Sequence, residues 1–197
     1  MTRLSPAAVT ALVAAGVLWA VHGTLTMLKP WGDEARYSED RGYSLVVDDG
    51  LFLLYNGPGA LALLLTAASA LVVARRIETA RPRLTGAGKA ALWASIGLGV
   101  VTVGGVVTLF DPVFTAARVA GAFVLGLGAV LVATTASRWA GPAASLGAVG
   151  VLMLGLLPLW PLVYAVRWLP EWGGAAYFVV LGISVVGLSG AARGLRH

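Results

Sequence analysis

The sequence predicts an all-α polytopic membrane protein, a bundle of about six transmembrane helices. Of its 197 residues, 58% are hydrophobic and only 12% are charged, about half the charged fraction that is usual for soluble domains. The mean hydropathy is +0.86, and the apolar residues form continuous runs of roughly twenty, the length that a helix needs to cross hydrocarbon. Membrane-barrel strands would alternate over shorter stretches, so the continuous runs favour helices.

The first predicted span covers residues 6–28 and has a proline near its start, where a helix tolerates one. Its apolar run is longer than that of a signal peptide and no clear cleavage site follows, so we expect it to be a membrane span. A polar outer loop over residues 29–49 holds six of the nine acidic residues. The second span covers residues 50–74 and ends at a pair of arginines.

A basic loop over residues 75–89 follows, and its proline and glycines are typical helix breakers. The four remaining spans are predicted over residues 90–110, 114–136, 143–168 and 174–192. Their short connections indicate antiparallel neighbours. We therefore expect residues 1–197 to form a single transmembrane domain.

Basic residues are distributed unequally between the two ends of this bundle. With the N-terminus in the cytoplasm, nine lysines and arginines lie inside and five lie outside. Because basic residues in short loops stay cytoplasmic, both termini are predicted to be cytoplasmic. Contact of the basic loops with anionic membrane lipids accounts for the net charge of +5 without nucleic acid as a partner. The bias toward alanine, glycine, valine, leucine and arginine is typical of a GC-rich bacterial genome, so we expect a multi-pass protein of the bacterial plasma membrane.

The composition also excludes several kinds of site. The chain has no cysteine and only two histidines, His22 and His197. A disulfide framework and a cysteine- or histidine-rich metal centre are therefore not expected. Lys29 and Lys89 lie at span ends, so no mid-helix lysine can carry retinal. No cofactor and no metal are predicted.

Polar side chains inside the predicted spans are few and lie near the outer ends. Because such groups are costly in hydrocarbon, each is a candidate functional residue. His22 precedes the end of its span by six residues and Arg118 follows Asp111 by seven, which places both about 10 Å from the outer side at 1.5 Å per residue. Polar side chains on the second and fifth spans lie at a similar level. The predicted ligand-binding residues are His22, Tyr55, Asn56, Arg118, Tyr164 and Arg167.

Glycine and proline are expected to loosen two of these spans, at residues 56–59 and at Pro158 and Pro161. Freed carbonyl groups require a protein-lined cavity, so the sequence predicts a polar and aromatic pocket open to the outer side. Structural roles stay open for the same residues. Arg118 can extend to the interface or pair with an acidic residue, and His22 can donate to a carbonyl group.

Three classes of function remain. The first, which we favour, is a protein whose outer pocket binds or helps to transport a small lipophilic molecule. The second is a membrane enzyme acting on a lipid or isoprenoid by cyclase-like acid catalysis, with Asp48, Asp49 or Asp111 as the catalytic acid. The third is an accessory subunit, or a homo-oligomer, that contacts its membrane partner through glycine-rich helix faces.

Overall fold

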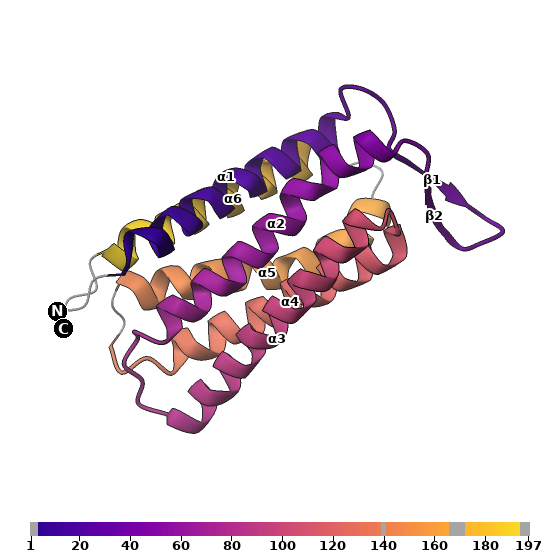
Figure 1. The fold of residues 1–197 in the computed structure, drawn as a ribbon. Coiled ribbons are helices and arrows are strands. Elements are labelled where there is room, and N and C mark those ends of the chain that lie inside the picture. Colours follow the sequence, from indigo (N-terminus) through magenta and orange to yellow (C-terminus); the bar gives the residue numbers. More distant parts are fainter. Residues whose placement is uncertain (1–3, 139–140, 166–171, 194–197) are drawn as a thin grey trace.

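The computed structural model describes residues 4–138, 141–165 and 172–193, and the side chains of residues 156–177 are not part of that description. Six helices follow one another along the chain (Figure 1). They are α1 (Pro6–Leu28), α2 (Asp49–Ala74), α3 (Pro82–Val107), α4 (Asp111–Thr134), α5 (Gly141–Ala165) and α6 (Trp172–Arg193). Two short strands, β1 (Ala35–Ser38) and β2 (Tyr43–Val46), lie between α1 and α2.

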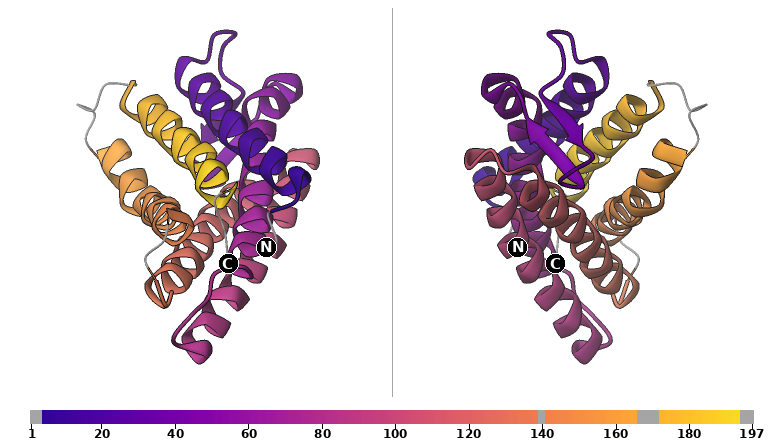
Figure 2. Two further views of the ribbon diagram at one scale, coloured as in Figure 1. Left: turned by 90° about the vertical axis from the view of Figure 1, so that its left-hand side faces the viewer. Right: turned by 90° about the vertical axis from the view of Figure 1, so that its right-hand side faces the viewer.

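The helices run up and down, and each packs against its neighbour in sequence. Because α6 also packs along α1, the six helices close into a ring, and α2 additionally contacts α4 and α5. The strand hairpin lies at one end of the bundle, and α1 begins and α6 ends at the other end (Figure 1). The right-hand view of Figure 2 looks onto the hairpin end. We call these the hairpin end and the terminal end.

Helices α1 to α4 are long and apolar enough to cross a membrane. Large apolar side chains cover their outer surface, with Val107 69% exposed, Val100 57% exposed and Trp93 55% exposed. Such a surface is unfavourable in water but suits hydrocarbon. These helices indicate a multi-pass membrane protein. The apolar segments found in the described parts of α5 and α6 are shorter, Gly141–Gly155 and Phe178–Arg193.

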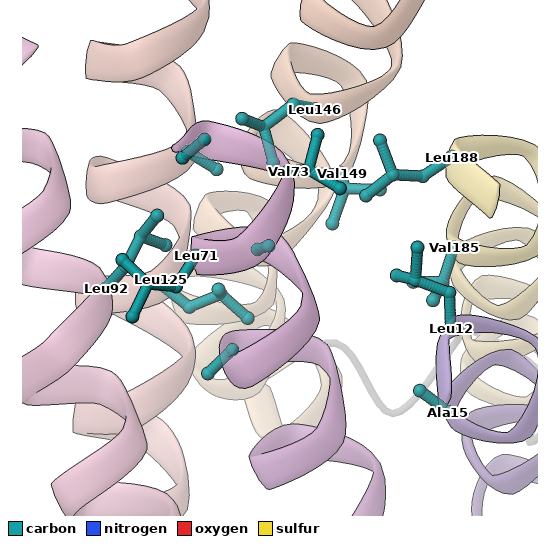
Figure 3. Packing of buried hydrophobic residues seen from close by; sticks show 14 of the residues in the cluster. Leu12, Ala15, Leu71, Val73, Leu92, Leu125, Leu146, Val149, Val185 and Leu188 are labelled. Carbon is teal, nitrogen blue, oxygen red and sulfur yellow. The ribbon is translucent and has the colours of Figure 1, made fainter. Parts of the chain in front are cut away.

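The interior is filled by aliphatic side chains from all six helices (Figure 3). Leu12, Leu92, Leu125, Leu146 and Leu188 have no exposed surface, and Leu71 has almost none.

Pairs of glycines bring the helix backbones together. A Cβ atom on Gly16 of α1 would lie 2.5 Å from the carbonyl oxygen of Gly182 in α6, and the reverse distance is also 2.5 Å. Similar reciprocal contacts join Gly88 with Gly128 and Gly126 with Gly150. Small residues permit this approach where lipid supplies no hydrophobic drive for association.

Two segments differ from the sequence prediction. Helix α3 begins at Pro82, so residues 82–89 of the expected basic loop are helical. Proline at the first helical position starts a helix rather than breaking it, and Gly88 is needed for the close contact with α4. The expected polar loop contains the hairpin, in which Ala35 pairs with Val46 and Ser38 with Tyr43. These strands are too short to give a clear alternating pattern.

Candidate functional site

His22 is buried in α1, and both of its ring nitrogens have partners on other helices. Nδ1 lies 2.7 Å from the carbonyl oxygen of Tyr55 in α2, and Nε2 lies 3.0 Å from Nη1 of Arg118 in α4. A guanidinium group donates hydrogen bonds but cannot accept them. Nε2 therefore accepts from Arg118, and Nδ1 carries the proton that is donated to Tyr55. The two contacts fix a neutral imidazole in one tautomer.

Gly59 of α2 makes room for the imidazole. A Cβ atom at this position would lie 2.6 to 2.8 Å from three atoms of the His22 ring. The expected loosening of α2 at residues 56–59 is not observed, because the helix runs through Pro58 without interruption. Proline removes one N–H group from the helical ladder, but the neighbouring glycine serves for close packing rather than for unwinding.

Aromatic side chains fill the space beside His22 on the side toward the middle of the bundle. Trp19, one turn earlier in α1, stacks on Phe178 of α6 with ring centroids 5.8 Å apart, and Phe178 meets the His22 ring edge-on at 5.3 Å. The Trp19 indole N–H donates to Thr66 Oγ1 at 3.1 Å. A molecule that reaches His22 must therefore approach from another side.

Arg118 of α4 is half-buried and reaches His22 of α1. Its guanidinium carbon is 4.6 Å from the centre of the Phe114 ring, one turn earlier in α4, a cation–π distance. Phe114 in turn packs edge-on against Phe52 of α2 at 5.7 Å. Asp111 at the start of α4 interacts electrostatically with Arg118. The cation is thus held by an imidazole and an aromatic face, with a carboxylate nearby.

The chain that follows α1 packs against Tyr55 of α2 at the hairpin end. The backbone N–H of Trp31 donates to the Tyr55 hydroxyl oxygen at 3.1 Å, and the two rings stack at 6.3 Å. Lys29 forms ion pairs of 3.0 Å with both Asp33 and Glu34. Burial lowers the pKa of Lys29, but the hydrogen bonds to these two carboxylates outweigh it and hold the pKa above its usual value.

The structure brings together three of the six predicted ligand-binding residues, since His22 contacts the Tyr55 carbonyl group and the Arg118 side chain. Asn56 is buried beside them, but its amide donates to the Phe52 carbonyl oxygen of its own helix at 3.2 Å. Tyr164 and Arg167 lie outside the part of the chain whose side chains are described.

The three candidate acids occupy helix N-termini. Asp48 caps α2 by accepting from the Leu51 N–H at 2.8 Å, and Asp49, the first residue of that helix, is exposed. Asp111 accepts from the Thr115 hydroxyl group at 3.2 Å. In the part of the chain that is described, no group of three or more residues could hold a metal ion.

Phe114 and Phe178 are site residues that the sequence analysis missed. Phe114 precedes Arg118 by four residues, and this helical spacing could have identified it. Phe178 gave no such signal, because it reaches the site through the packing of α6 against α1.

Comparison with protein families, with curated proteins and with solved structures finds no significant match. With Nε2 of His22 occupied by Arg118 and Nδ1 by a carbonyl group, the imidazole orients a cation rather than transferring protons. The arrangement suits recognition of a polar group at the border of an apolar interior.

Proposed function

We propose that the chain crosses the bacterial plasma membrane six times, with both termini in the cytoplasm, and that its outer half binds or helps to transport a small lipophilic molecule. The observation that carries this proposal is the position of the charged Arg118 side chain. It lies in a helix long and apolar enough to span a membrane, where a charged group is costly and is usually retained for function.

The packing around Arg118 supports a particular mode of binding. Trp19 and Phe178 occupy the inner side of His22, so the ligand approaches from the hairpin end or from the lipid beside α4. Its polar end accepts hydrogen bonds from the guanidinium group, and its apolar body lies against the membrane-facing helices.

The test is mass spectrometry of small molecules that co-purify with the protein. We would compare the wild type with Arg118→Ala, His22→Ala and the control Arg41→Ala. The control changes an exposed arginine between β1 and β2. A discrete molecule present in the wild type and control but absent from the two site variants supports the proposal. The same bulk phospholipid in all four samples would refute it, provided that circular dichroism shows equal helix content.

A subunit role is the second candidate, and one feature of α3 favours it. Gly86, Gly97 and Gly104 face open space, with no atom within 4 Å of a Cβ added at any of them. Exposed small residues at helical spacing are typical of helix–helix interfaces in membranes. Gly97→Leu should then shift the mass of the purified particle toward the monomer, while Gly57→Leu, also at an open position, should not.

The enzyme hypothesis keeps Asp111 as its best acid, because this residue interacts with Arg118. Asp48 caps α2, and Asp49 is exposed at the start of that helix. Loss of a lipid product on Asp111→Asn, with unchanged binding of the co-purified molecule, would favour the enzyme.

A further inference from the structure

The terminal end of the bundle is strongly basic. Among the described residues, this end carries the basic side chains Arg75, Arg76, Arg81, Arg83, Lys89, Arg138 and Arg193, and a single acidic one, Glu78. All of these except Lys89 are exposed. The hairpin end has the opposite balance, with Lys29, Arg36 and Arg41 against Asp33, Glu34, Glu39, Asp40, Asp48, Asp49 and Asp111.

The α2–α3 connection at the terminal end is held rigidly against the end of α4. The backbone N–H of Ser137 donates to the Glu78 carbonyl oxygen at 2.9 Å, and that of Ala80 donates to the Thr135 carbonyl oxygen at 2.9 Å. The hydroxyl groups of Thr85 and Thr135 lie 2.9 Å apart, and Ile77 of the connection is buried in the core. The arginines that flank these contacts therefore project from a fixed backbone rather than from a loose loop.

An aromatic side chain borders this basic surface. The Arg75 guanidinium carbon lies 5.5 Å from the centre of the Trp93 ring on α3, and Trp93 is 55% exposed. From the middle of α3 to its end the outer face is apolar, with Val100, Val101 and Val107 all exposed. A charged group, an aromatic ring and exposed aliphatic surface, in this order, match the headgroup, the interface and the acyl chains of a phospholipid.

We infer that the terminal end binds the phosphate headgroups of anionic phospholipids, with Arg75 and Trp93 as one contact and with Arg81 and Arg138 as further basic contacts on the α2–α3 and α4–α5 connections. The continuous apolar face of α3 selects a lipid over a nucleic acid, because only a lipid can cover that face and the basic surface together. This surface lies at the opposite end from the His22–Arg118 site, so the inference is independent of the proposed ligand. Each basic side chain near an anionic surface contributes about fivefold to binding.

The experiment is native mass spectrometry of the full chain in detergent with added phosphatidylglycerol or phosphatidylcholine. We expect the wild type to retain phosphatidylglycerol preferentially, and the triple variant Arg75→Gln/Arg81→Gln/Arg138→Gln to lose at least tenfold of that preference. The control Arg36→Gln/Arg41→Gln changes two exposed arginines of the β-hairpin and should leave the preference unchanged. Trp93→Leu should weaken retention of both lipids.

Several outcomes would overturn the inference. Equal retention of the two lipids by the wild type would mean that headgroup charge is not recognised. An equal loss in the hairpin control would show a general charge effect. Displacement of phosphatidylglycerol by millimolar inorganic phosphate would show that the surface binds free phosphate rather than lipid. Because thermal unfolding of each variant is recorded in parallel, a folding defect in the triple variant would be recognised, and Arg138→Gln alone would then serve as the test.

Discussion

Gly59 is the position at which one methyl group tests the geometry of the candidate site. Its Cβ atom in Gly59→Ala would lie 2.6 Å from Cδ2, 2.7 Å from Cγ and 2.8 Å from Nδ1 of His22. Real Cβ atoms do not approach other atoms so closely, so the imidazole or the α1–α2 packing must shift. The ring is held by the Tyr55 carbonyl group and by Arg118, and a shift loosens both contacts.

The expected cost follows from these contacts. Forcing an extra methyl group into a packed interior costs about 1 to 3 kcal/mol, and a weakened hydrogen bond adds about 1 kcal/mol. We expect Gly59→Ala to reduce the free energy of unfolding by about 2 to 4 kcal/mol, measured by denaturation in mixed micelles. Gly57→Ala is the matched control, because it lies in the same helix at a position with open space. It should be neutral or stabilising by up to about 1 kcal/mol, since alanine is the better helix former.

A double-mutant cycle decides whether the imidazole is the cause. In the His22→Ala background the ring is gone, so Gly59→Ala should then cost less than about 1 kcal/mol, and the coupling energy should lie in the range of directly contacting residues. An unchanged cost in that background would refute the assigned contact between His22 and Gly59. It would indicate that the methyl group disturbs α2 itself.

Three further predictions concern the rest of the bundle. Thr66→Val leaves the buried Trp19 N–H without its acceptor and should cost about 1 to 3 kcal/mol of unfolding free energy, whereas Thr134→Val, at an exposed hydroxyl group, should cost almost nothing. Burial lowers the pKa of Lys29, but its hydrogen-bonded carboxylates outweigh this and hold the folded-state pKa above 10.5. Its stabilising contribution is thus complete below pH 10.5 and is lost as the pH rises through the raised folded-state pKa. The difference in melting temperature between wild type and Lys29→Met should therefore vanish once the pH exceeds that pKa. Gly182→Leu should separate α1 from α6 and lower stability in the same micelle assay, whereas Gly187→Leu, which points into open space, should be tolerated.

The helices themselves follow from hydropathy and proline placement. The range predicted for the first span, residues 6–28, coincides with α1, because Pro6 begins the helix and Lys29 ends it in a left-handed conformation with φ of 40°. Hydropathy could not locate the start of α3. The polar first turns of that helix carry no apolar signal, although they are helical in the structure.

Two members of the candidate site, His22 and Arg118, were predictable from the sequence, but the contact between them was not. Depth along each span identified His22 and Arg118, because helical rise converts residue number into distance. It could not show that one accepts a hydrogen bond from the other, since that depends on how α1 and α4 are rotated about their axes. The role of Gly59 was predicted wrongly for the same reason. In the sequence, a glycine beside a proline predicts a break in the helix. Only its position opposite the His22 imidazole shows that Gly59 permits close packing.

The charges at the two ends also limit which ligand can reach Arg118. Among the described residues, a small anion arriving from solution at the hairpin end meets seven acidic side chains and three basic ones, so these charges oppose its approach. A neutral molecule with a hydrogen-bond acceptor has no such barrier, and if it is lipophilic it can enter from the bilayer beside α4. The proposed ligand should therefore be uncharged at its polar end. A fatty acid that co-purifies in its ionised form would contradict this, whereas an alcohol, ketone or ester would agree with it.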